Sequence, residues 1–99
     1  CSKLTDDQRA ILTKLIHVWV GDLPKKQADA RMKEIAAQLG DCRFAWRGPF
    51  EPGSDASYHL YGPGLILEFG GQDLGGDPAE HLHSIYRDPT NEYGARWIK

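Results

Sequence analysis

The hydrophobic pattern of this 99-residue chain changes period near Gly40. Before that glycine, apolar residues recur at three- and four-residue spacing, whereas after it apolar and polar residues alternate in short runs separated by glycine and proline. We therefore predict an α+β chain, with an N-terminal helical hairpin (about 5–39) packed on an antiparallel β-sheet of about four strands (about 42–88). A tail over 89–99 completes a single domain, 1–99.

Two helices are predicted before Gly40. The first should begin at Thr5-Asp6-Asp7-Gln8, because this capping box lets Thr5 and Gln8 satisfy each other's backbone N–H groups. The second should begin with Pro24 in its first turn and end at Gly40. The apolar stripes of the two helices are Ile11, Leu12, Leu15, Ile16 and Trp19 in the first, and Ala28, Met32, Ile35, Ala36 and Leu39 in the second.

The remaining chain is predicted to form strands over 42–47, 57–61, 65–69 and 81–87. If 62–64 is a three-residue hairpin loop, Tyr61 lies opposite Leu65 and Tyr58 lies opposite Glu68. One face of the sheet would then carry Tyr58, Leu60, Ile66 and Glu68. The other, more apolar face would be the one toward the helices and would carry His59, Tyr61, Leu65, Leu67 and Phe69.

The strongest candidate for a site is the run that begins at His81. In a strand, His81, His83 and Arg87 would share one face because they occupy alternate positions. Two imidazoles at this spacing can bind a divalent transition metal such as zinc, copper or iron if Glu68 arrives from a neighbouring strand as the third ligand. Two ordinary histidines are the alternative. Arg87 is suited to grip a small anionic ligand, with an ion pair to Asp88 as the structural alternative.

The glycine-rich segment 70–78 is a second candidate, because glycine lets backbone approach a bound group closely. Within it, Gln72 is predicted to contact a ligand or cofactor, and Asp77 and Glu80 are alternative carboxylate ligands for a metal. The segment lacks the Gly-Lys-Ser/Thr sequence of a phosphate-binding loop, so a plain connection between strands is the alternative. His17 and His59 stand alone in the pattern and are assigned no role.

Composition excludes some classes of function. Twelve basic and fourteen acidic residues leave a net charge of −2 with no basic stripe, so we expect no nucleic-acid partner. The apolar run around 18–20 is far shorter than the ~20 residues of a membrane span, so none is expected. Cys1 and Cys42 can form one disulfide or remain free. Cys1 itself can be a cleavage product, a lipid-bearing terminus or the arbitrary start of a fragment.

A family resemblance is carried by segments 4–9, 44–49, 61–63, 67–69, 74–78 and, most specifically, the His-x-His to Asn-x-Tyr-Gly run of 81–94. Through them the chain resembles the C-terminal part of a bacterial family of unknown function numbered 3500. The resemblance implies a longer parent protein with an N-terminal portion absent here, often carried behind an export signal. An exported location, periplasmic or extracellular, is therefore expected, with the cytoplasm as the alternative. The resemblance implies no activity.

Three functions remain open. The leading prediction is a metal- or ligand-binding module with His81, His83 and Glu68 as metal ligands and with Arg87 and Gln72 toward a bound molecule. A metal-bound water would permit hydrolysis, although whether the chain is an enzyme stays open. The second function is a small-molecule site in which the same side chains act without metal. The third is an interaction domain that docks the N-terminal portion or another chain.

Overall fold

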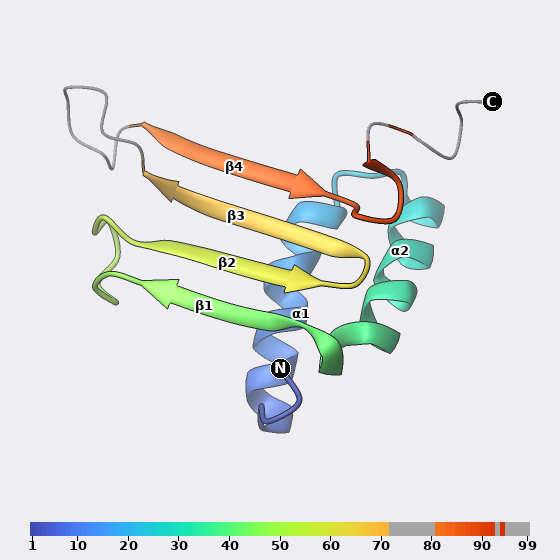
Figure 1. Ribbon diagram of the computed structural model, residues 1–99, viewed down its shortest axis with the longest axis horizontal. Helices are drawn as coiled ribbons and strands as arrows, with labels where there is room; N and C mark the ends of the chain where they lie inside the picture. Colours follow the sequence, from blue (N-terminus) through green and yellow to red (C-terminus); the bar gives the residue numbers. More distant parts are fainter. Residues whose placement is uncertain (72–80, 93, 95–99) are drawn as a thin grey trace. The chain divides into compact units, whose positions relative to one another are not determined.

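The computed structural model describes residues 1–71, 81–92 and 94 (Figure 1). It contains two helices followed by a four-stranded antiparallel sheet, which confirms the predicted α+β class. The chain divides into two compact units, residues 1–42 with the helices and residues 43–99 with the sheet.

Two helices form the first unit and contact each other. Helix α1, Asp6–Val20, begins at the predicted capping box: Thr5 N donates to Gln8 Oε1 at 3.0 Å, and Gln8 N donates to Thr5 Oγ1 at 3.2 Å. Helix α2, Lys25–Gln38, begins after Pro24, which is its N-cap residue and not part of its first turn. Neither helix is long and apolar enough to span a membrane.

Buried side chains mark one face of each helix: Leu12, Ile16 and Val20 in α1, and Ala28 and Ile35 in α2. Leu39 and Cys42, in and after the 3₁₀ turn η1 (Leu39–Asp41), are buried as well. The predictions for Ile11 and Ala36 are wrong, since Ile11 is 66% exposed and Ala36 is exposed as well. The buried residues recur every four positions, and Ile11 lies about 100° around the helix from the first of them.

The two cysteines are free, and they differ in burial. Cys42 is 3% exposed, with its Sγ 3.5 Å from the Gln38 carbonyl oxygen, and burial raises the pKa of its thiol. Because the thiolate is the reactive form, we predict that iodoacetamide at pH 8 alkylates Cys42 at least ~10-fold more slowly than Cys1 in the native protein. Site-resolved mass spectrometry measures both rates. They should converge in urea, and equal native rates would contradict the prediction.

The sheet has the strand order β1-β2-β3-β4, each strand antiparallel to the next (Figure 1). Its strands are β1 (Arg43–Arg47), β2 (Ser57–Gly62), β3 (Leu65–Gly71) and β4 (Leu82–Arg87). Gly62 pairs with Leu65, so the β2–β3 loop has two residues and the predicted three-residue loop is wrong. Pro63 explains the difference, because its fixed φ suits the first turn position and leaves Gly62 in the strand.

This pairing changes which side chains share a face. His59 lies opposite Glu68, and Tyr58 lies opposite Phe69, so the predicted pairing of Tyr58 with Glu68 is wrong by one residue. The histidine face, as we call it, carries Arg43, Ala45, Arg47, Ser57, His59, Tyr61, Ile66, Glu68, Gly70, His83, Ile85 and Arg87. The opposite, aromatic face carries Phe44, Trp46, Tyr58, Leu60, Leu65, Leu67, Phe69, Leu82, Ser84 and Tyr86, and its three β2 and β3 leucines are buried.

Candidate functional site

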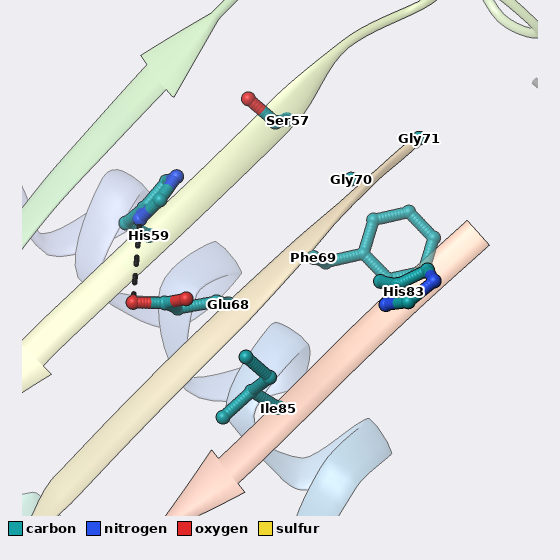
Figure 2. Close-up of a pocket in the computed structure, with 8 residues that line it drawn as sticks. All are labelled: Ser57, His59, Glu68, Phe69, Gly70, Gly71, His83 and Ile85. Atoms are coloured by element: carbon teal, nitrogen blue, oxygen red, sulfur yellow. Dashed lines mark ion pairs between the residues drawn. The ribbon is translucent and has the colours of Figure 1, made fainter. Parts of the chain in front are cut away.

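An open hollow of about 230 Å³ lies on the histidine face, and His59, Glu68 and His83 line it (Figure 2). The hollow exists because Gly70, which pairs with His83 and follows Glu68 on the same face, has no side chain to fill it. The structure therefore brings the Glu68 carboxylate of β3 together with two imidazoles from the neighbouring strands, His59 of β2 and His83 of β4.

The two histidines of the His-x-His run converge. His81 directly precedes β4, and its Nε2 atom lies 2.9 Å from Nε2 of His83, with ring centroids 4.9 Å apart. Both residues are exposed. At this distance one nitrogen donates its proton to the lone pair of the other, so the pair holds a single proton between two inward-facing nitrogens.

Glu68 is held by a short hydrogen-bond chain. Tyr61 Oη donates to Glu68 Oε1 at 2.6 Å, and His59 Nδ1 lies 3.1 Å from Tyr61 Oη and 3.7 Å from the same carboxylate oxygen. Because the only hydroxyl proton of Tyr61 points at Glu68, Nδ1 of His59 must donate to Tyr61 Oη. The hydrogen bond to Glu68 raises the pKa of the Tyr61 hydroxyl, since the carboxylate favours the protonated phenol.

His59 is the site residue that sequence reasoning missed. The three-residue loop had placed it on the face opposite to Glu68, whereas the true pairing puts the two side chains next to each other (Figure 2). A signal was present, because His59 and Tyr61 alternate in a strand whose turn contains Pro63. A two-residue loop would have predicted the cluster.

Arg87 lies on the histidine face but at the far end of β4, opposite Ile66. Its guanidinium contacts Glu92 at two points, with Nη2–Oε1 at 2.8 Å and Nε–Oε2 at 3.3 Å. A small anion would have to displace this carboxylate, so the Arg87–Glu92 ion pair gives the arginine a structural role. The other predicted contacts, at Gln72, Asp77 and Glu80, lie outside the described residues.

Within the part of the chain that the structure describes, no group of three or more His, Cys, Asp or Glu side chains is arranged to hold a metal ion. The geometry supplies the converging imidazoles of His81 and His83, and Glu68 lines the same hollow as His83 while its Oε1 contacts Tyr61 and His59. Chemically, the site can accept protons, donate hydrogen bonds and offer two nitrogen ligands.

Comparison with known proteins gives one match. The model of a family described as "Protein of unknown function (DUF3500)" matches residues 1–95, which agrees with the resemblance seen in the sequence. No curated protein matches, and no solved structure matches.

Proposed function

This chain belongs to the DUF3500 family of proteins of unknown function, and we propose that it is a transition-metal-binding module with His81 and His83 as its first two ligands. The observation that carries the proposal is the 2.9 Å separation of their Nε2 atoms. Two nitrogens bound to one ion at right angles, each ~2.0–2.1 Å from the metal, lie ~2.9 Å apart. If the donor ring carried its proton on Nδ1 instead of Nε2, both Nε2 atoms would offer a lone pair at that spacing.

The same distance favours copper(II) over zinc. Right-angled ligands suit the square-planar or tetragonal sites of copper(II) and nickel(II). Tetrahedral zinc needs its nitrogens ~3.3 Å apart, so the histidine side chains would have to separate. Copper(II) also stands highest in the general affinity order of divalent metals. We therefore expect copper(II) to bind more tightly than zinc.

Glu68 is the proposed third ligand. Its Oε1 accepts the hydrogen bond from Tyr61, whereas no described residue bonds its Oε2. Carboxylates that bind metals are commonly oriented by such second hydrogen bonds, so the Tyr61 contact would prepare Glu68 for this role. A water or a bound molecule would complete the coordination, which would leave a position open for chemistry.

The test is the metal content and the copper(II) and zinc affinity of protein purified without an affinity tag. We expect about one equivalent of metal, with copper(II) binding tighter than zinc by calorimetry. Changing residues that only orient metal ligands typically weakens metal binding ~10–100-fold. The double substitution His81→Ala, His83→Ala removes two ligands and should weaken copper(II) binding by more than that. Glu68→Gln, which keeps an acceptor for Tyr61, should weaken it by about 10-fold.

His17→Ala is the matched control, because it removes an exposed histidine of α1 that is far from this pair in the sequence. Copper(II) affinity should be unchanged in this variant. If the wild type, the control and the double variant all bind copper(II) equally weakly, the metal proposal fails. The metal-free reading would then apply to the same side chains.

A second candidate function, an interaction domain, is favoured by a row of rings on the aromatic face. Phe69, Tyr58, Trp46 and Phe50 stack in succession with centroids 5.5, 6.4 and 5.9 Å apart. Trp46 is 44% exposed and Phe50 is 85% exposed, which is unusual for large rings at the end of a row. If the row of rings binds a second copy of this chain, Phe50→Ser should weaken self-association measured by sedimentation. A wild-type protein that stays monomeric would argue against a second copy as the partner.

We also propose, from the resemblance, that the module is the C-terminal part of a longer, exported bacterial protein. An N-terminal portion of that protein would be its nearest partner. Fractionation of cells that express the full-length protein would place it in the periplasm or medium, and a cytoplasmic location would contradict the proposal.

A further inference from the structure

Two arginines on the histidine face have no ion-pair partner among the described residues. The β1–β2 pairing places Arg43 opposite Tyr61, Ala45 opposite His59, and Arg47 opposite Ser57. Neither guanidinium takes part in an ion pair or side-chain hydrogen bond within 1–71, 81–92 and 94. Arg87, on the same face, is instead neutralised by Glu92. In a chain of net charge −2, β1 therefore carries two uncompensated cations.

A hollow lies beside Arg47. It has a volume of about 380 Å³ and is lined by Arg47, Ala45, His59 and Tyr61, together with Trp46. Ala45 makes the space, because its methyl group is the only side chain on this face between the two arginines of β1. The hollow is distinct from the one that Glu68 and His83 line, and His59 is the residue common to both.

The tautomer of His59 determines what this hollow can bind. Since Nδ1 donates to Tyr61, the neutral ring presents Nε2 as a hydrogen-bond acceptor. Figure 2 shows the second ring nitrogen directed away from Glu68 and along β2 toward Ser57, the residue that Arg47 faces across the strand pair. Arg47, a guanidinium donor, and His59, an imidazole acceptor, therefore occupy diagonal positions of the β1–β2 pair and line the same hollow.

We propose that this hollow binds a small anion that also carries a hydroxyl group, such as a 2-hydroxycarboxylate or hydrogen phosphate. The anionic oxygens would accept two hydrogen bonds from the planar fork of Arg47, and the hydroxyl group would donate to His59 Nε2. Arg43 adds a second positive charge on the same strand. Glu68, the acidic residue among the strand positions of this face, accepts a hydrogen bond from Tyr61 and forms no ion pair with Arg47.

Lactate and propionate are the matched probes, because they differ only in the hydroxyl group. Titrations followed by ¹H–¹⁵N spectra, including the arginine Nε–H signals, should give saturable lactate binding with a Kd of about 1 mM. Propionate should bind ~2–10-fold more weakly, the value of one neutral hydrogen bond. Arg47→Gln should weaken lactate at least ~10-fold, and Arg47→Lys should recover only part of the loss.

Two variants make the test specific. His59→Ala should abolish the preference for lactate over propionate, whereas Arg87→Gln should leave both affinities within about twofold. The titrations are repeated in metal-free buffer with the His81→Ala, His83→Ala variant, which should retain lactate binding, so that failure of the metal site and failure of this site are distinguishable. Inorganic phosphate in place of lactate identifies which anion binds better.

Two results would overturn the proposal. One is chemical-shift changes that do not saturate with lactate, and the other is equal lactate affinity in the wild type and Arg47→Gln.

Discussion

Replacing Leu67 by alanine is expected to lower the free energy of unfolding by about 3 kcal/mol, within the ~2–5 kcal/mol range for buried leucines. Leu67 is 0% exposed in β3, a central strand with neighbours on both sides. It pairs with Leu60, which is also fully buried, and with Tyr86. Alanine would leave a cavity there that two hydrogen-bonded neighbouring strands cannot easily close.

Urea unfolding followed by circular dichroism measures this loss, and hydrogen exchange at the β2 and β3 amides should show the same loss of protection. Leu82→Ala is the matched control, since Leu82 lies on the same face in β4 but is 56% exposed. It should cost less than ~1 kcal/mol. Equal losses in the two variants would show that Leu67 is not a core residue.

The helices could be predicted because their signals are local. The capping box of Thr5 and Gln8 lies within four residues, and its two hydrogen bonds form as the sequence indicates. In α1, the stripe that was predicted contains the buried Leu12 and Ile16, but it omits the buried Val20 and includes the exposed Ile11. The width of the buried face of a helix depends on the elements that pack against it, and the spacing of apolar residues does not reveal those elements.

The sheet was predicted in strand number and direction but not in register. Register depends on where the turn is centred, and a shift of one residue transfers every side chain of a strand to the other face. Here Pro63 centres the turn on two residues, so that Leu65 pairs with Gly62 and Glu68 moves to the side of His59. Because the length of one loop was predicted wrongly, the hydrogen-bonded series His59–Tyr61–Glu68 was not predicted.

The partner of Arg87 could not be predicted from spacing. Glu92 reaches the guanidinium because residues 88–92 turn back after β4, which brings together side chains five positions apart. The sequence shows the charges but not the turn that brings Glu92 back to Arg87. By contrast, His81 and His83 needed only the two-residue period of an extended chain to come together.

Gly70→Ala is the prediction that links the shape of the site to stability. A Cβ atom at Gly70 would lie 2.8 Å from Cβ of Ser57 on β2, closer than real Cβ atoms approach each other. The strands would have to move apart, which we expect to cost about 1–3 kcal/mol of unfolding free energy in urea. Gly40→Ala is the control, because nothing lies within 4 Å of its added Cβ, and its stability should change by less than ~1 kcal/mol.

A double-mutant cycle with Ser57→Gly separates this steric contact from other costs of replacing Gly70. Ser57→Gly removes the Cβ atom that the new alanine would meet, so the double variant should be more stable than the sum of the single losses predicts, by about 1 kcal/mol or more. Strict additivity would show that Gly70 is not required by its approach to Ser57. Because Gly70 has no side chain, β2 and β3 can approach each other closely and the space beside His83 stays empty. With strict additivity, the open shape of that hollow would not depend on the spacing of β2 and β3.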